Sequence, residues 1–259
     1  GNVNNIRALF NYKNFKLIRG DVRDKVLIQR ATAGVDVILH LAAQIHVDKS
    51  IIDPKYTFEV NTLGTLNILD AALESEVGLL VYTSTSEVYG SAQYVPMNEK
   101  HPLNPASPYA ASKAAADRLC FAYYNTYKLP VVIVRCFNTY GPRQGDIGYA
   151  AVVPKFIRRV IQGLPPVIYG DGKQTRDYMY IEDAVKAYDL LLESHKNLLG
   201  KVVNFGTGRE TRILELANTI IKLCNRDESL KPVHVAPRPG EVKRLCGDIS
   251  LAKKELGFK

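Results

Sequence analysis

Residues 81–90 read VYTSTSEVYG, and residues 107–119 read SPYAASKAAADRL. The first segment is an apolar, β-branched run with a polar end, which is typical of a strand in a buried sheet. The second begins a helical pattern, in which side chains at i and i+4 share one face. The polar side chains that these two segments contribute are Thr85, Ser86, Glu87, Tyr109 and Lys113.

Tyr109 and Lys113 form a pair that can carry out acid–base chemistry. A free tyrosine has a pKa of about 10 and is a poor base at neutral pH. A lysine ammonium nearby favours the phenolate and lowers that pKa. The pair can then take a proton from a hydroxyl while a hydride leaves the same carbon, and Thr85 can hydrogen-bond to the same oxygen. The alternative is that Tyr109 packs against its neighbours and Lys113 is a solvated helix residue.

Four segments occur in an order that resembles a known family. They are HLAAQ at 40–44, TSTSEVYG at 83–90, YAASK at 109–113 and FNTYGP at 137–142. In this order they resemble the extended short-chain dehydrogenases/reductases, with nucleotide-sugar epimerases and 4,6-dehydratases, such as the dTDP-glucose 4,6-dehydratases, the most similar group. The resemblance runs from about residue 20 to residue 258. It implies bound NAD, a nucleotide-diphosphate sugar as substrate, and a homodimer formed through helices at 53–76 and 106–128.

Composition narrows the functional class further. The chain has 259 residues, of which 46% are hydrophobic, enough for one core or for a core with a small lobe. The net charge is 34 − 26 = +8, but the basic residues are scattered and favour an anionic small molecule over nucleic acid. No apolar run approaches the roughly 20 residues of a membrane span, and no signal-peptide pattern is present. The four cysteines lack metal-ligand spacing, so we expect a cytoplasmic protein without a metal site or a membrane partner.

Strands and helices alternate along the chain. This predicts an α/β fold, a doubly wound parallel Rossmann-like sheet with a small C-terminal substrate-binding lobe. Residues 1–142 are expected to form the NAD-binding part, with sheet elements continuing to about 206, and residues 143–259 mainly the nucleotide-sugar lobe. The expected strands are 15–18, 35–41 (buried), 79–84, 131–135, 167–169 and 202–205. The expected helices are 25–31, 53–76, 106–128, 154–162, 182–192 and 213–223, after a loop at 1–14.

The resemblance assigns the cofactor site. Asp21 and Val22 match the residues that contact the adenine. The alternative for Asp21 is to cap the helix that follows, but Asp24 can act as that cap while Asp21 contacts the adenine. Small residues after the strand at 35–41 allow close approach of a dinucleotide. The matched cofactor residues are Asp21, Val22, Leu41, Ala42, Ala43, Gln44, Asn61, Tyr109 and Lys113.

The substrate residues that the resemblance implies are Asn138, Arg176 and Arg244. Asn138 matches a residue that holds a phosphate or hydroxyl of the nucleotide sugar. The two arginines match diphosphate ligands, because the guanidinium fork can donate two hydrogen bonds to a phosphate. Arg158 and Arg159, on an amphipathic helix, are expected on a solvated face.

The family also has features that this sequence lacks. A strand, a glycine-rich turn and a helix open its cofactor domain, and one further helix follows the segment that LGF resembles here. We therefore expect a fragment, and expect that this chain alone binds NAD poorly, because that turn holds the pyrophosphate.

Glu87 bears on the reaction. In a 4,6-dehydratase, Tyr109 would take the proton of the sugar 4-hydroxyl, and Glu87 would take the C5 proton. Ser86 stands where well-known dehydratases have an aspartate, and a serine is a weak acid for water loss at C6. A 4-epimerase and a UDP-glucuronate decarboxylase remain alternatives, and so does a structural salt bridge for Glu87. A non-catalytic sensor would not need Thr85, Tyr109 and Lys113 together.

Overall fold

The computed structural model describes residues 2–145, 151–224, 230–238 and 240–258. Its centre is a four-stranded parallel sheet in the order β1-β2-β3-β8. The register pairs Thr85 with Cys136 and Cys136 with Phe205, so these strands end together at one edge. The strands are β1 Val37–His40, β2 Leu79–Thr85, β3 Val131–Cys136 and β8 Val202–Phe205.

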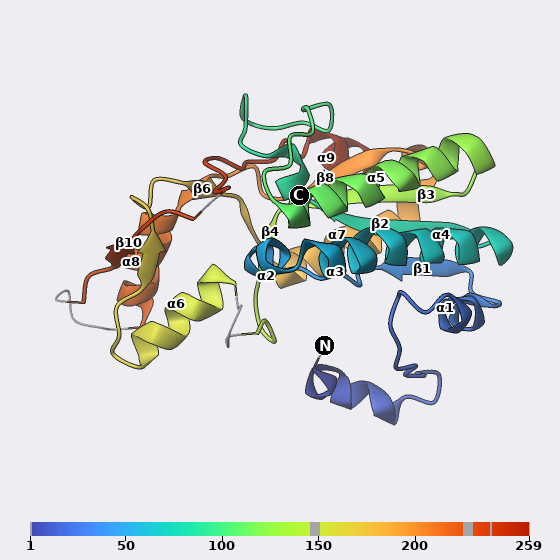
Figure 1. Ribbon diagram of the computed structural model, residues 1–259, viewed down its shortest axis with the longest axis horizontal. Helices are drawn as coiled ribbons and strands as arrows, with labels where there is room; N and C mark the ends of the chain where they lie inside the picture. Colours follow the sequence, from blue (N-terminus) through green and yellow to red (C-terminus); the bar gives the residue numbers. More distant parts are fainter. Residues whose placement is uncertain (1, 146–150, 225–229, 239, 259) are drawn as a thin grey trace.

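Helices cover both faces of this sheet, as Figure 1 shows for the right-hand part of the molecule. One face packs against α1 (Lys25–Thr32), α4 (Gly64–Glu74) and α5 (Pro108–Tyr127). The other face packs against α7 (Ile181–Ser194) and α9 (Ser250–Leu256). Apolar side chains alternate between the two cores along each strand, so Leu80 belongs to the first and Val81 to the second. The fold is therefore the expected doubly wound α/β fold.

A smaller group of elements lies beside the sheet, on the left of Figure 1. α6 (Val152–Ile161) packs on α8 (Ile213–Leu223), next to the parallel pair of β5 (Val167–Tyr169) and β10 (Val233–Val235). Two short ribbons connect this group to the sheet. They are the parallel pair β4 Asn138–Tyr140 with β7 Tyr178–Tyr180, and the antiparallel pair β6 Thr175–Arg176 with β9 Thr211–Arg212.

Side-chain caps fix the starts of several predicted helices. Asp24 accepts a hydrogen bond from the Leu27 N–H at 3.0 Å, as expected of an N-cap. Ser107 does the same for Ala110 at 3.1 Å and so fixes the start of α5. α9 (Ser250–Leu256) has no side-chain cap at its N-cap residue Ile249, although Asp248, one residue earlier, accepts from the Ser250 N–H at 2.8 Å. Among the described residues, no helix is both long and apolar enough to span a bilayer.

Three predictions near the N-terminus are wrong. The expected loop at 1–14 contains a 3₁₀ helix, Val3–Asn11, with no buried residue. The expected strand at 15–18 does not form, because it has no hydrogen-bonded neighbour among the described residues and three of its four residues, Lys16, Leu17 and Ile18, are exposed. The strand at 35–41 is shorter and lies at the edge of the sheet, with Val37 and Leu39 exposed rather than buried.

The helix predicted at 53–76 is interrupted. It comprises α3 (Pro54–Phe58), a π-helical turn at Glu59–Leu63 and α4. The helix before it, α2 (Val47–Ile52), was not predicted. π-turns recur at functional sites, because the wider turn shifts the side chains that follow it. This turn contains Asn61, one of the predicted cofactor residues.

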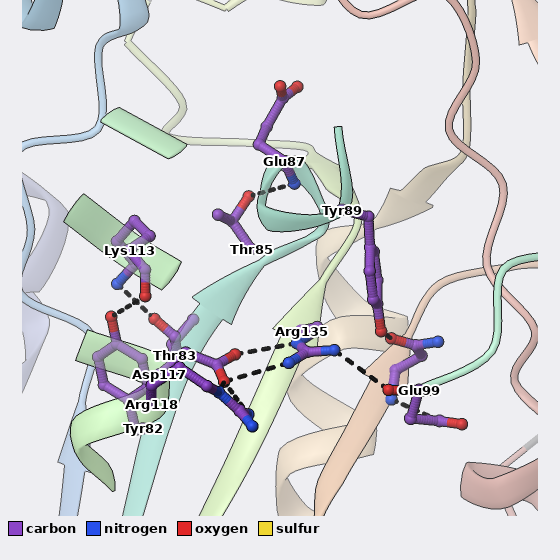
Figure 2. A network of polar contacts seen from close by, with 11 residues as sticks. Tyr82, Thr83, Thr85, Glu87, Tyr89, Glu99, Lys113, Asp117, Arg118 and Arg135 are labelled. Carbon is purple, nitrogen blue, oxygen red and sulfur yellow. Dashed lines mark hydrogen bonds and ion pairs between the residues drawn. The ribbon is translucent and has the colours of Figure 1, made fainter. Parts of the chain in front are cut away.

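A buried ion pair holds α5 against the sheet. The Arg135 Nε and Nη2 atoms donate to the two carboxylate oxygens of Asp117 at 2.9 and 3.1 Å, and both side chains are at most 2% exposed (Figure 2). The Arg135 guanidinium also lies 4.7 Å from the centre of the Tyr89 ring. Burial acts to raise the pKa of Asp117, but Arg135 and Arg118 hold it below its usual value. The pair therefore fixes α5, β3 and the turn that carries Tyr89 relative to one another.

Replacing Asp117 by Asn should lower the free energy of unfolding by about 3–5 kcal/mol, because Arg135 is left buried without its counter-charge. Urea unfolding of both proteins at neutral pH measures the difference. The double variant Asp117→Leu/Arg135→Met, which leaves neither member of this pair charged, should lose less. The control is Asp183→Asn at an exposed site. If Asp117→Asn were as stable as this control, the Asp117–Arg135 pair would not be what holds α5 against the sheet.

Candidate active site

One cavity of about 1050 Å³ opens between the carboxyl edge of the sheet and the smaller group of elements. In a parallel α/β sheet, ligands bind at this edge. Five of the residues singled out from the sequence line the cavity, and they come from β2, the turn after it, α5, β4 and β6. They are Thr85, Glu87, Tyr109, Asn138 and Arg176.

Glu87 reaches the cavity because the chain turns sharply where β2 ends. A 3₁₀ turn, Ser86–Tyr89, follows the strand, and the Glu87 N–H donates to the Thr85 hydroxyl at 3.3 Å. Figure 2 shows the Glu87 carboxylate pointing away from the Asp117–Arg135 pair. Burial raises the pKa of Glu87, Arg176 lowers it, and Glu241 raises it. A carboxylate whose pKa is raised in this way is suited to take up and release a proton.

Tyr109 lies in the first turn of α5, directly after the Ser107 cap. Its side chain is 9% exposed and lines the cavity. Burial raises the pKa of Tyr109 to about 12, and the Thr85 hydroxyl acts in the opposite direction. Thr85, Glu87 and Tyr109 therefore share one wall of the cavity.

Lys113 is held by β2 in this arrangement, and its effect on the pKa of Tyr109 stays a prediction. Its ammonium donates to the Thr83 carbonyl oxygen at 2.6 Å and lies 4.3 Å from the centre of the Tyr82 ring (Figure 2). Burial lowers the pKa of Lys113 to about 8. The sequence spacing placed the ammonium on the correct helix face, but it could not foresee the carbonyl that binds it.

Ser86 and Arg244 lie outside the set of residues that line the cavity. Ser86 is 2% exposed and is not among the residues that line the cavity. Arg244 is largely exposed and pairs with Glu210 at 2.6 Å. The predicted roles of Ser86 in catalysis and of Arg244 in diphosphate binding stay predictions that the geometry does not support.

Arg176 is held in place before any ligand arrives. Its Nη1 atom donates to the carbonyl oxygens of Thr175 and Val242, and its Nη2 atom donates to Glu241 at 2.9 Å. It is 9% exposed and lines the cavity. A guanidinium at this place can hydrogen-bond to an anionic ligand.

Asn61 links the end of β1 to the helix that carries Tyr109. Its side chain accepts from the Gln44 N–H at 2.7 Å, and donates to the Gln44 carbonyl at 3.0 Å and to the Ser112 hydroxyl at 2.9 Å. The Ser112 hydroxyl donates in turn to the Tyr109 carbonyl at 2.7 Å. Asn61 is therefore a buried connector between these segments.

The remaining predicted cofactor residues lie near that connector, beyond the cavity lining. Leu41 and Ala42 are exposed where β1 ends, Ala43 is half-buried, and Val22 packs near Gly64. The Asp21 carboxylate is exposed and pairs with Arg23 at 2.8 Å. Among the described residues, no cluster of three or more His, Cys, Asp or Glu side chains could hold a metal ion.

The sequence analysis missed several residues that line the cavity. Arg158 and Arg159 do so, which corrects the prediction that they lie on a solvated face. Arg238 also lines it, with its guanidinium 4.0 Å from the centre of the Tyr169 ring. A basic amphipathic helix was visible in the sequence, but which face meets the cavity depends on how α6 packs.

The fold and the Tyr109/Lys113 pair define an enzyme of the extended short-chain dehydrogenase/reductase class. The family model described as GDP-mannose 4,6 dehydratase matches residues 1–259, and the chain belongs to this family. It is 37% identical to a dTDP-glucose 4,6-dehydratase from Actinoplanes sp. over 259 residues, covering 100% of this chain and 79% of that protein.

Solved structures agree with this assignment. A dTDP-glucose 4,6-dehydratase from Streptomyces venezuelae, solved with NAD bound, has a TM-score of 0.94 and 36% identity, covering 100% of this chain and 79% of that one. A UDP-glucuronic acid 4-epimerase from Bacillus cereus, also with NAD, has a TM-score of 0.92 and 30% identity, covering 99% and 80%. Dehydratases and epimerases are thus both structural neighbours of this chain.

Proposed function

We propose that this protein is an NAD-dependent nucleotide-sugar 4,6-dehydratase. The observation that carries the proposal is the shared cavity wall of Tyr109, Thr85 and Glu87, a hydroxyl-activating pair beside a carboxylate with a raised pKa. Arg176 on the opposite ribbon supplies a cation for the diphosphate. The dTDP-glucose 4,6-dehydratases among the relatives support the same reaction.

NAD is the proposed cofactor, in keeping with the neighbours solved with it. The residues present fit a dinucleotide. Where β1 ends, small or exposed side chains at Leu41, Ala42 and Ala43 leave the backbone accessible, and the exposed Asp21 carboxylate can accept from a ribose or adenine group. Bound NAD supplies the acceptor for the C4 hydride and returns that hydride later in the reaction.

Tyr109 performs the first proton transfer. Its phenolate takes the proton of the sugar 4-hydroxyl as C4 is oxidised to a ketone, and the Thr85 hydroxyl hydrogen-bonds to the same oxygen. Since burial raises the pKa of Tyr109 to about 12, positive charge near the phenol is needed to form the phenolate. Lys113 is the cation on the same helix.

Glu87 performs the second proton transfer. The 4-ketone acidifies the C5 proton, which passes to the Glu87 carboxylate. The C6 oxygen leaves as water when it takes a proton, and the protonated Glu87 is the nearest candidate donor because Ser86 does not line the cavity. Donating that proton regenerates the Glu87 carboxylate. Hydride return to C6 and transfer of a solvent proton to C5 then give the methyl group, and Tyr109 releases the proton of the 4-hydroxyl to solvent.

A 4-epimerase is the second candidate. The observation that favours it is that Ser86 is 2% exposed and does not line the cavity, so it is poorly placed to act as the acid for the C6 hydroxyl. In an epimerase the 4-keto sugar only turns over in the cavity and receives the hydride on its other face. Glu87 would then act as a structural carboxylate beside Arg176.

Turnover in D₂O separates these two reactions. The protein is incubated with NAD and either dTDP-glucose or UDP-glucose, and the products are examined by NMR. A dehydratase exchanges the C5 proton, so deuterium should enter at C5 of the product. Product without deuterium at C5 but with inverted C4 would reject the dehydratase in favour of the epimerase.

We also propose a homodimer, formed through α3–α4 and the outer side of α5. Large apolar side chains are exposed along this surface. They are Tyr56, Leu63 and Phe121. Clustered exposure of this kind is typical of an interface.

A further inference from the structure

Buried polar atoms without partners are concentrated at the cavity. Among the described residues, four buried side-chain atoms have no hydrogen-bond partner within the protein, and Ser84 Oγ is the one that lies away from the cavity. The other three belong to residues that line it: Asn138 Oδ1, Gln144 Oε1 and Tyr178 Oη. Buried polar groups in folded proteins almost always have partners, so this concentration points to a ligand.

The fold places two of these atoms on one surface. Asn138 on β4 and Tyr178 on β7 are register partners in a parallel ribbon, so their side chains leave it on the same side. Met179, the next residue of β7, points the opposite way and is fully buried in the core behind the ribbon. The cavity side of the ribbon therefore displays an amide oxygen beside a phenol.

The third atom is fixed in orientation by its own amide. The Gln144 Nε2 atom donates to the Thr139 carbonyl at 3.1 Å, so the nitrogen is committed and Oε1 remains as a free acceptor. Asn138 Oδ1 and Gln144 Oε1 are thus both acceptor oxygens that have no donor among the described residues, and such oxygens repel a phosphate and attract O–H or N–H donors. Tyr178 can donate or accept, and its raised pKa, caused mainly by burial, keeps it a neutral phenol.

The position of Arg176 indicates which part of the substrate this polar surface contacts. It is two residues before Tyr178, and its charge acts on both Tyr178 and Glu87. If the diphosphate lies at Arg176, the neutral part that lies between Arg176 and Glu87 is the hexose. Hydroxyl groups of a hexose provide the donors that the two amide oxygens lack.

We propose that Tyr178, with Asn138 and Gln144, forms the surface that binds the hydroxyl groups of the hexose, and that Tyr178 is a specificity-determining residue for the sugar. This inference rests on the proposed function, because it takes a nucleotide-diphosphate hexose as the ligand. It adds two residues, Gln144 and Tyr178, to which the sequence assigned no role. It also favours the hydroxyl over the phosphate as the group that Asn138 binds.

The test compares Tyr178→Phe with wild type in binding dTDP-glucose and dTDP, each by calorimetry. The variant removes one oxygen and keeps the ring. We expect affinity for dTDP-glucose to fall about tenfold, as for the loss of one hydrogen bond, and affinity for dTDP to stay unchanged. The thermal midpoint of the ligand-free variant should be equal or higher, because the hydroxyl has no partner in the protein.

The matched control is Tyr180→Phe, which removes a hydroxyl from the same strand at a residue outside the cavity lining. Its affinity for dTDP-glucose should equal that of wild type. Equal affinity of Tyr178→Phe and wild type for dTDP-glucose would overturn the inference, and so would an equal loss for both ligands. Binding is measured separately from turnover. If wild type binds dTDP-glucose but forms no product, that result contradicts the proposed function and leaves the inference about sugar binding standing.

Discussion

Replacing Tyr109 by Phe should reduce turnover by a factor between about 10² and 10⁴, the range for loss of a general acid–base residue. The variant keeps the ring that packs at the start of α5 and removes only the oxygen, so folding should be preserved. Because this oxygen takes the first proton, no sugar is oxidised and no NADH forms. Rapid-mixing absorbance, which follows NADH within one turnover, should show no reduced cofactor.

The control for Tyr109→Phe is Tyr127→Phe at the far end of the same helix, where the side chain is 53% exposed. That variant should turn over at the wild-type rate. If Tyr109→Phe retained full turnover, Tyr109 would not be the base. If neither wild type nor variant turned over any nucleotide sugar yet both bound it, a sensor would be the better description.

Replacing Glu87 by Gln should also slow product formation, by about 10² to 10⁴-fold, but at a later step. Tyr109 is intact, so the sugar is still oxidised at C4 and NADH should build up to an observable level. The 4-keto sugar then stalls, because no carboxylate takes the C5 proton. The two variants therefore differ in one direct readout, NADH absent in the first and accumulated in the second.

The pH dependence of Glu87→Gln provides a second readout. The carboxylate of Glu87 has to be ionised to act as a base, so wild-type turnover should fall as the pH drops through its raised pKa. A folded-state pKa above the unfolded value means that stability is lost as pH rises from about 4.5 towards that pKa. Glutamine does not titrate, so Glu87→Gln should be the more stable protein at neutral pH.

The control for Glu87→Gln is Glu182→Gln at the exposed start of α7, which should match wild type in rate and stability. An active Glu87→Gln protein that gives unchanged product would mean that Glu87 is structural. The reaction would then be an epimerisation, as the buried position of Ser86 already allows.

The parts of the fold that local sequence determines were predicted well. β2 and β3 begin as continuous apolar runs, and Asp24 caps α1 as expected. The failures depend on neighbours distant in the sequence. Residues 15–18 have strand-like composition but no partner strand, and β1 is half exposed because it lies at the sheet edge. The π-turn around Asn61 has no local signal at all.

The site was predicted about as well as the fold: local motifs identified several of its residues, but contacts with residues distant in the sequence were missed. Parallel strands end at one edge, which brought Thr85, Glu87 and Asn138 together with Tyr109 in one cavity. The sequence could not show which polar side chains find a hydrogen-bond partner in the folded protein. The ammonium of Lys113 binds the Thr83 carbonyl, and the hydroxyl of Tyr178 has no partner within the part of the chain that the structure describes. Neither fact follows from a motif.

The measurement that tests the central claim most directly is identification of the product that wild-type protein makes from dTDP-glucose or UDP-glucose with NAD. Mass spectrometry and NMR of the product decide the reaction. The account predicts a product lighter than the substrate by one water, with a ketone at C4 and a new methyl group at C6. A product of unchanged mass with inverted C4 would contradict it and leave Glu87 without a catalytic role.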